Sequence, residues 1–400
     1  MNGGAGGIPG AIDIRLDGRW LPVDGWVFTA LFGDSVVSTR AAYVGALQSG
    51  TIGFTQFVEL ARAARIPYVL FFAPREHVAH QLQQKTRTLL AGVSKDAFSM
   101  NSRSVVHLRD IELIVRDILR KQEELKKRDS TLVLNPLVGC LRGSRGSVTG
   151  DADTIRAVLD FTTGQLQATR TKQDALDFLI DTLEAHQVFV SQSQRGFMPQ
   201  QMPRGVKFSG MCVKDKKIPF IFLTGGDGSD NPEPAGRKIF TLTLLTVFAA
   251  RGKFAPVTYD DQTGEVIHDR EYQIAEEVLM PAAQVRVLDA STLDAVKEDA
   301  ERFKVTPSAF VMRARRLRLI GPERAVGYLD ELHAEFAARG KQPRNNPKPV
   351  NAVRKYAGTE YTRRMFAQMD RGTISPTDFR RVVCLNKLTA TQLPSLRASL

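Results

Sequence analysis

The segment that most constrains how this chain folds is RKIFTLTLLTVFAARG at residues 237–252, because apolar side chains dominate its length. Its pattern predicts either a strand or a helix of about four turns. GGDGSDNPEPAG, at residues 225–236, is rich in helix breakers and predicts a loop directly before it. Apolar side chains such as Leu242, Leu244 and Leu245 are therefore expected to fill a core.

Sheet and helix patterns flank this apolar segment. HQVFVSQS and GVKFSGMCVKDKKIPFIFLTG show strand-like alternation and a DKK turn, which predicts an antiparallel sheet. Residues 152–183 have helical periodicity, and HDREYQIAEEVLMP predicts an acidic helix that stops at Pro281. Residues 291–320 predict two helices joined by a turn at Thr306 and Pro307. Together these elements predict an α+β core.

The first part of the chain has patterns of its own. IDIRLDGRWLPVDGWVF predicts two short strands that form a hairpin. Two short helices follow, the first of which ends at Gly50. Apolar residues from Val105 to Leu119 recur at helical spacing and precede a KKR run, which predicts a long amphipathic helix with a charged end. Residues 130–150 predict a loop.

The length of the chain and one linker predict several modules. Domains commonly contain about 100–200 residues, and ARGKQPRNNPKPVN at 338–351 is polar and proline-rich. The predicted fold class is α+β and mostly helical. The predicted modules are 1–75 with the hairpin and first helices, 76–150 as a helical connector, 151–325 as the core with its small antiparallel sheet, 326–351 as a helix end with the linker, and 352–400 as a C-terminal helical module.

The charge balance favours an acidic partner. Lysine and arginine outnumber aspartate and glutamate by 55 to 43, which favours contact with nucleic acid and is also typical of a generally basic surface. Cys140, Cys212 and Cys384 lie too far apart for a CxxC metal site, and their odd number argues against a disulfide framework. The cysteine pattern therefore predicts a reducing cytoplasm, and because no apolar run approaches the roughly 20 residues of a membrane span, we expect no membrane partner.

Four motifs occur in order along the core. They are FSGMCVKDKKIPFIFLTG, RKIFTLTLLTVF from Arg237, IAEEVLMP ending at Pro281, and VTPSAF with the segment from Arg313 to Ile320. In this order they resemble the ImmA/IrrE family of regulatory zinc peptidases. The resemblance implies a zincin-like core. It also implies a setting in prophages, mobile elements or toxin–antitoxin operons, where such proteins control a repressor or neutralise a toxin.

The zinc motif of that family is degenerate in this chain. In HExxH, two histidines one helical turn apart bind zinc and the glutamate activates the metal-bound water. Leu244, Leu245 and Phe248 stand at those positions, and His268, or Glu271 after a shift of three residues, stands at the position of the third ligand. Leucine and phenylalanine neither bind a metal nor accept a proton. We therefore expect no catalytic residue, no metal site and no cofactor, although zinc is the cofactor of the family.

A non-standard metal site is the main alternative. His268, Asp269, Glu271, Glu276 and Glu277 are clustered in the sequence and would have to bind zinc together with His186. Tetrahedral zinc needs at least three converging protein ligands. Such a site would make the chain an active zinc endopeptidase that cleaves a transcriptional repressor. The simpler interpretation of these residues is a charged helix face.

Segments near both ends resemble helix-turn-helix domains. Residues 46–74 are similar to the back half of an XRE-type domain, whereas its recognition helix is not recognisable in this chain. Residues 356–400 are similar to the end of long family members. The candidate nucleic-acid contacts there are Arg363, Arg364, Arg371, Arg380, Arg381 and Lys387. The alternative is a solvated basic face on a docking module.

The resemblance and the degenerate motif together predict a catalytically inactive regulator. We expect it to bind a toxin or a repressor-type protein, with DNA as a further candidate partner. The predicted partner groove lies between the sheet at 207–223 and the helix at 240–250, and its candidate residues are Arg237, Lys238, Phe208 and Phe220. Two alternatives stay open, which are the zinc endopeptidase and a DNA-binding transcription factor.

Overall fold

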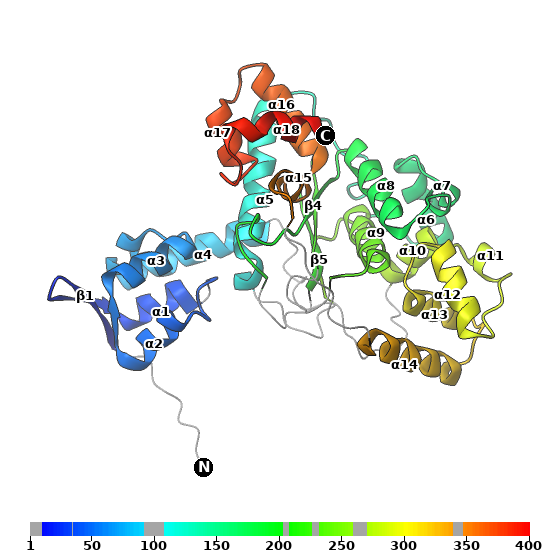
Figure 1. Ribbon diagram of the computed structural model, residues 1–400, viewed down its shortest axis with the longest axis horizontal. Coiled ribbons are helices and arrows are strands. Elements are labelled where there is room, and N and C mark those ends of the chain that lie inside the picture. The colour runs from blue at the N-terminus through cyan, green and yellow to red at the C-terminus, as the bar shows by residue number, and fades with distance from the viewer. Residues whose placement is uncertain are drawn as a thin grey trace, which may run out of the picture. The chain divides into compact units, whose positions relative to one another are not determined.

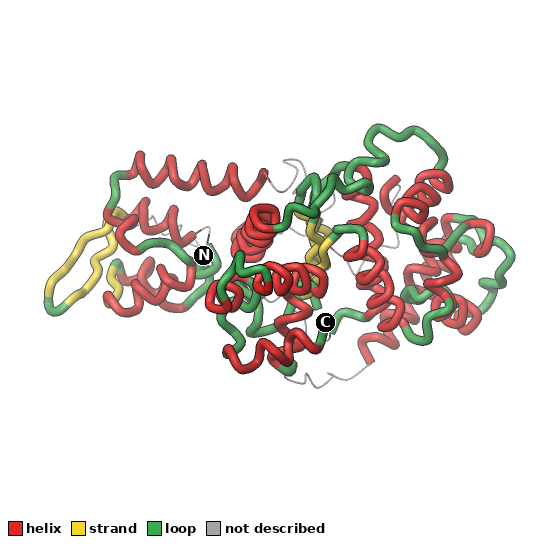
Figure 2. The backbone as a smooth tube through the Cα atoms, turned by 90° about the horizontal axis from the view of Figure 1, so that it is seen from above, coloured by secondary structure: helices red, strands yellow, loops and turns green. Residues whose placement is uncertain are grey.

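A computed structural model describes residues 10–33, 35–91, 108–202, 208–225, 232–258, 270–338 and 347–400. The protein is α+β and mostly helical, with two small sheets, which confirms the predicted fold class (Figures 1 and 2). The described residues form two compact units, one containing residues 10–91 and 108–116, the other containing the residues from 117 onward. Among the described residues, no helix combines the length and the apolar character that a membrane crossing requires.

The first unit is built around a three-stranded sheet with the order β2–β1–β3. Strands β1 (Ala11–Leu16) and β2 (Arg19–Asp24) form the predicted antiparallel hairpin, and β3 (Thr51–Gly53) pairs in parallel with β1. Asp17 and Gly18 make the hairpin turn with positive φ angles of 48° and 77°. The helical elements of this unit are α1 (Gly25–Gly33), α2 (Ala41–Ser49), α3 (Phe54–Ala64), η1 (Tyr68–Phe72) and α4 (Arg75–Ala91).

Aromatic packing forms the core of the first unit. Phe28, Phe32, Phe57 and Phe71 are at most 1% exposed and contact one another. The prediction carried the hairpin strands as far as Phe28, whereas α1 begins at Gly25. Phe28 and Phe32 are one helical turn apart on α1, so both side chains lie on the face that points into the core. The prediction of a strand overlooked this helical spacing.

Helix α5 (Leu108–Arg128) begins in the first unit and ends in the second. It contains the predicted amphipathic pattern and its KKR end, except for Val105, which lies outside the described residues. The other helices of the second unit before its sheet are α6 (Val148–Val158), α7 (Thr163–Gln167) and α8 (Lys172–Ala185). Thr162 and Thr171 each begin a helix with a capping box, which explains why one periodic stretch divides into separate helices.

The second sheet has the order β4–β6–β5–β7. Its strands are β4 (Phe189–Gln192), β5 (Phe208–Val213), β6 (Phe220–Leu223) and β7 (Pro256–Thr258). Pairing of β5 with β6 is antiparallel, as predicted, but β4 runs parallel to β6. The expectation of a wholly antiparallel sheet was therefore wrong. Strand β5 lies between β4 and β6 in the chain, so no hairpin turn joins β4 to β6. Their connection is long enough for the two strands to run parallel.

Helices cover both faces of this sheet. The apolar segment is α9 (Ala235–Arg251), which packs on β5 and β6 from one side and shares a hydrophobic core with Val190, Cys212 and Ile221. On the other side the rings of Phe189 and Phe220 contact Tyr361, from the C-terminal helices. Every residue of β5 and β6 is buried as a result.

The helices after β7 include the predicted acidic helix and the predicted pair within residues 291–320, together with a short helix, α11, that was not predicted. They are α10 (Arg270–Leu279), α11 (Ala282–Val285), α12 (Leu293–Arg302), α13 (Pro307–Arg316) and α14 (Pro322–Ala338). Thr306 caps α13 and Pro307 occupies its first turn, as the sequence predicts.

The chain ends in a group of short helices. They are α15 (Pro349–Ala357), α16 (Thr359–Asp370), α17 (Pro376–Val382), η3 (Ala390–Gln392) and α18 (Leu393–Ala398). Helices α15 and α16 pack on β4 of the second sheet. Most of the predicted linker, residues 339–346, lies outside the described residues, and the predicted module boundaries stay a prediction.

Candidate functional site

The positions that match the zinc motif lie inside the hydrophobic core. Leu244, Leu245 and Phe248 on α9 are 1%, 0% and 3% exposed. They belong to the same cluster of buried residues as strands β5 and β6. The three side chains are apolar and enclosed, so this part of the helix has neither a metal ligand nor a base to offer.

Close packing between α9 and β5 depends on a glycine. A Cβ atom at Gly210 would lie 2.5 Å from the carbonyl oxygen of Phe222 and 3.0 Å from Cδ1 of Leu245. Any larger residue would have to move the strand or the helix. Leu245 therefore occupies the space directly against the sheet.

The residues proposed for the third ligand differ in their surroundings. His268 and Asp269 lie outside the described residues. Glu271 on α10 is buried and accepts contacts from Lys253 at 2.7 Å and Arg251 at 3.2 Å. Burial raises the pKa of Glu271, but the hydrogen bond from Lys253 and the two nearby cations lower it further, and the net effect is a lowered pKa. Glu271 thus neutralises two cations at the end of α9.

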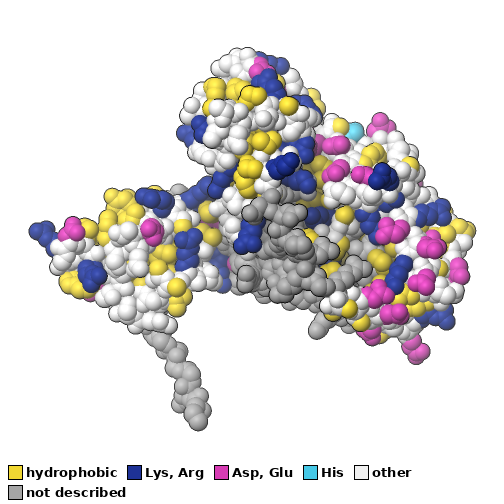
Figure 3. Space-filling view, in the orientation of Figure 1, with side chains coloured by type: hydrophobic (Ala, Val, Ile, Leu, Met, Phe, Trp, Pro, Cys, Tyr) yellow, Lys and Arg dark blue, Asp and Glu magenta, His cyan; other side chains and the backbone are white. Residues whose placement is uncertain are grey.

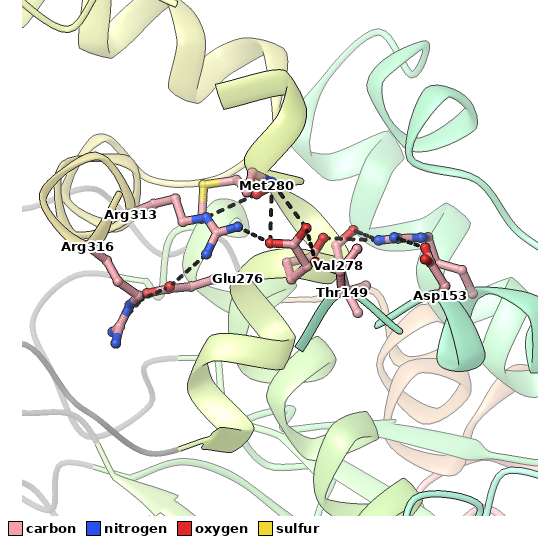
Figure 4. A network of polar contacts seen from close by, with 10 residues as sticks. Thr149, Asp153, Glu276, Val278, Met280, Arg313 and Arg316 are labelled. Atoms are coloured by element: carbon pink, nitrogen blue, oxygen red, sulfur yellow. Dashed lines mark hydrogen bonds and ion pairs between the residues drawn. The ribbon is translucent and has the colours of Figure 1, made fainter. Parts of the chain in front are cut away.

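The other two acids of that sequence cluster form a buried network with arginines (Figure 4). Arg313 on α13 pairs with both Glu276 and Glu277, and its Nε donates to the carbonyl oxygen of Met280 at 3.1 Å. Arg316 adds an ion pair to Glu276 at 2.8 Å. Burial raises the pKa of Glu276 despite these cations. Because each buried carboxylate faces a cation, the network joins α10 to α13.

Two contacts from helix α6 extend this network to a third helix. Nη1 of Arg156 donates to the carbonyl oxygen of Glu277 at 3.0 Å, and Thr149 donates to the Glu277 carboxylate at 3.4 Å. The network was not predicted, because nothing in the sequence indicates that residues so far apart meet. It fits a structural brace between three helices.

His186 does not approach these acids in a ligand arrangement. It caps the end of α8, and its Nδ1 lies 2.8 Å from the carbonyl oxygen of Thr182. Across the described parts of the chain, no group of three or more His, Cys, Asp or Glu side chains has an arrangement that would hold a metal ion.

The predicted partner groove contains two kinds of residue. Arg237 and Lys238 lie in the first turn of α9 and are partly exposed, and Arg237 is 3.5 Å from Glu233. Phe208 and Phe220 are 3% and 0% exposed, so their side chains face the interior. Of these four candidate residues, the two basic ones are therefore those with partly exposed side chains.

The basic residues of the C-terminal helices divide into two groups. Arg364 pairs with Asp129 at 2.9 Å, and Nε of Arg380 donates to the carbonyl oxygen of Leu388 at 2.9 Å, so both stabilise the fold. The other candidates, Arg363, Arg371, Arg381 and Lys387, are exposed, and two of them form surface ion pairs, Arg363 with Glu360 and Arg381 with Asp378. Figure 3 shows Lys and Arg side chains recurring over these helices, at the top of the view.

Where the C-terminal helices meet the rest of the unit, a lysine is fully buried. Nζ of Lys121 on α5 donates to the carbonyl oxygen of Tyr356 at 3.1 Å, lies 4.1 Å from the centre of the Tyr356 ring, and is 3.5 Å from Asp117. Burial lowers the pKa of Lys121 to about 8, against the opposing effect of Asp117. The Tyr356 hydroxyl donates to Asp117 at 2.9 Å.

A buried glutamate lies at the same junction. Glu184 on α8 accepts from the backbone N–H groups of Glu360 at 2.8 Å and Val190 at 3.3 Å. Burial raises the pKa of Glu184 to about 7, although both hydrogen bonds act in the opposite direction. The sequence does not reveal the role of Lys121 or of Glu184, because each residue is one charge among many on an amphipathic helix.

Comparisons with known proteins return no relative. No protein-family profile, no characterised protein and no solved structure matches this chain.

Proposed function

We propose that this chain is a regulatory binding protein with a peptidase-like core that does not hydrolyse peptides. The observation that carries the proposal is the burial of Leu244, Leu245 and Phe248 against the second sheet. A hydrolytic zinc site needs polar ligands that converge on an open position. In this chain the matching positions contribute to stability instead, and the function is recognition of a protein partner of the toxin or repressor type.

The basic start of α9 supports a surface for such a partner. Arg237 and Lys238 are partly exposed beside strands whose side chains are buried. We assign them to the partner surface, where they would attract acidic side chains.

The first experiment is capture of the tagged full-length protein with its bound partners from its native host, with and without nuclease, followed by mass spectrometry. We expect a stoichiometric protein that survives nuclease. Arg237→Glu combined with Lys238→Glu should weaken its capture, whereas Arg324→Glu, at an exposed position on α14, should not. Equal capture of the partner by the wild type, the double variant and the Arg324→Glu control would exclude Arg237 and Lys238 from the partner surface.

A metal titration tests the endopeptidase alternative. If His186 and His268 belong to a working site, the purified protein binds about one zinc per chain and cleaves its captured partner, and His186→Ala abolishes both properties. Our proposal expects neither property. Zinc-dependent cleavage that is lost in His186→Ala would overturn it.

A second candidate function is contact with DNA through the C-terminal helices. Residues 349–400 contain nine basic and three acidic side chains. Arg363 and Arg381 have side chains 54% and 66% exposed. Phosphate contacts by such residues depend strongly on salt.

Binding of a duplex from the promoter of this gene at several salt concentrations tests that function. Arg371→Glu with Arg381→Glu should reduce the salt dependence by about one unit of slope per lost phosphate contact. Arg324→Glu again serves as the control. An unchanged slope in the double variant would remove the C-terminal helices from the DNA surface.

A further inference from the structure

Among the described residues, strand β4 lies at one edge of the second sheet and has β6 as its single neighbour. The outer side of an edge strand presents backbone groups that another strand can pair with. On β4 these groups are covered from within the chain. The N–H of Val190 donates to the Glu184 carboxylate at 3.3 Å, and a Cβ atom at Gly358 would lie 3.1 Å from the Val190 carbonyl oxygen.

The cover is the turn between α15 and α16, residues 356–360, which we call the turn plug. Its first carbonyl group, that of Tyr356, accepts hydrogen bonds from Lys121 and Ser191. Its last N–H group, that of Glu360, donates to Glu184 at 2.8 Å. Gly358 has a φ of 94°, which lets the turn approach the strand closely. The turn plug is thus held at both ends and meets the β4 edge at its middle.

The burial of polar groups at this junction lowers the stability of the docked turn plug. Lys121 is 0% exposed and Glu184 is 3% exposed. The hydroxyl of Tyr361 is buried without a hydrogen-bond partner in the described part of the chain. An apolar junction of the same shape would be more stable than one that buries these groups. All three regain hydration when the turn plug leaves, which favours reversible docking over permanent packing.

We propose that the turn plug is a displaceable cover of the β4 edge, and that an extended strand of the protein partner replaces it by pairing with β4. Main-chain hydrogen bonds would supply the affinity in this mode of recognition. Tyr361 directly follows the turn plug in the chain and would move with it. Its ring lies 6.4 and 6.0 Å, between ring centres, from Phe189 and Phe220, so its departure would also uncover these two rings. The partner strand would then place apolar side chains on this aromatic pair.

Hydrogen exchange in the full-length protein tests the displacement. Gly358→Ala adds a methyl group against Glu184 and Val190 and strains the turn, so the protection of the β4 amides should fall about tenfold or more while α9 stays protected. Gly372→Ala is the matched control, because Gly372 also has a positive φ but has no atom within 4 Å of the added Cβ.

A second variant is expected to act in the opposite direction. Tyr361→Phe removes the buried hydroxyl and keeps the ring, so it should close the turn plug more firmly and raise β4 protection several-fold. This variant keeps the inference testable if Gly358→Ala does not fold. Protection that stays unchanged or falls in Tyr361→Phe contradicts a displaceable cover.

Strand pairing is tested with a short peptide of alternating valine and threonine with a lysine at each end. It should bind Gly358→Ala about tenfold more tightly than the wild type, because opening raises the competent fraction. A peptide of the same length with only proline between its two lysines has no N–H donors to pair with β4 and should not bind. Equal affinity of the two peptides, or of the two proteins, overturns strand pairing at β4.

Only the identity of the occupant rests on the proposed function. Failure of the exchange experiment would remove the turn plug and leave a partner surface at α9 intact. Failure of the capture experiment alone would leave the turn plug as a property of the fold.

Discussion

The two sheets of this protein differ in how many of their faces meet solvent. On β1 of the first sheet, Ile12 and Ile14 are buried, whereas Ala11 and Arg15 are exposed. On β5 and β6 of the second sheet, every residue is buried. In the described part of the chain, the first sheet has helices against its buried face, and the second has α9 on one face and the C-terminal helices on the other.

This difference determines where each sheet can meet a partner. The outer face of the first sheet presents side chains such as Trp20, which is 54% exposed. The described residues of β5 and β6 expose no side chain, so we expect a partner to reach the second sheet through an edge strand. Charged substitutions and added methyl groups should therefore have very different effects in the two sheets.

The largest expected effect comes from a charge placed in each sheet. Phe220→Asp would bury an unpaired carboxylate, and we expect a loss of more than about 4 kcal/mol or failure to fold. Trp20→Asp, on the exposed face, should change stability by less than about 0.5 kcal/mol. Both tryptophans, Trp20 and Trp26, lie in the first unit. Far-UV circular dichroism during urea unfolding is therefore the common readout, and similar losses in both variants would contradict the comparison.

The next effect concerns pH and the charges buried beside β4. The pKa of Lys121 is lowered from 10.5 to about 8, so the folded state binds fewer protons in that window and stability rises there with pH. The pKa of Glu184 is raised from 4.5 to about 7, so stability falls as pH rises through that window. Each change amounts to up to about 3 kcal/mol.

We therefore expect a minimum of stability of the second unit between about pH 7 and pH 8. Urea unfolding at several pH values measures this dependence. Lys121→Met should remove the rise on the alkaline side, and Glu184→Gln should remove the fall on the acidic side. Arg15→Met, on the exposed face of the first sheet, should leave both slopes in place. A pH profile that is flat in the wild type would show that neither group retains its shifted pKa.

A smaller effect is expected from one added methyl group in each sheet. Gly210→Ala places a Cβ atom 2.5 Å from the Phe222 carbonyl oxygen, and we expect a loss of about 1–3 kcal/mol. At Gly53 the nearest atom to an added Cβ is Oε1 of Gln56 at 3.8 Å, so Gly53→Ala should be tolerated. Thermal unfolding of both variants tests the difference, and equal melting temperatures would show that β5 and α9 can separate slightly without cost.

The smallest effect concerns single hydroxyl groups. Ser191→Ala removes a buried hydrogen bond to Tyr356, and we expect a loss of about 1 kcal/mol, because Lys121 still donates to the same carbonyl oxygen. Thr51→Ala, at an exposed position of β3, should change stability by a few tenths of a kcal/mol. Urea midpoints of the two variants provide the measurement. A larger loss for Thr51→Ala would reverse the comparison.

Local sequence signals predicted several elements well. The Asp17 and Gly18 turn predicted the hairpin, because both residues tolerate positive φ. Thr306 with Pro307 predicted the start of α13 through capping and a preset φ. The apolar run at 237–252 was open between helix and strand, and in the structure it is α9.

Other elements had no local signal. Strand β7 covers three residues, Pro256–Thr258, which is too short for alternation to be recognised. The parallel pairing of β4 with β6 joins strands that are separated by β5 in the chain, so no turn signal marks it. Prediction of the candidate site was limited in the same way. Leu244 and Leu245 were predicted to be core residues from their type. The burial of Phe208 and Phe220, in contrast, depends on helices distant in sequence.

The sequence by itself determined the mostly helical α+β class, the hairpin, the helix starts and the apolar character of the segment at 237–252, because these follow from residues a few positions apart. Only the tertiary structure decided that Lys121 and Glu184 form hydrogen bonds with the turn between α15 and α16, and that this turn covers the β4 edge. Such contacts join segments far apart in the chain, and the free energy of burying each charge depends on partners that no local pattern specifies.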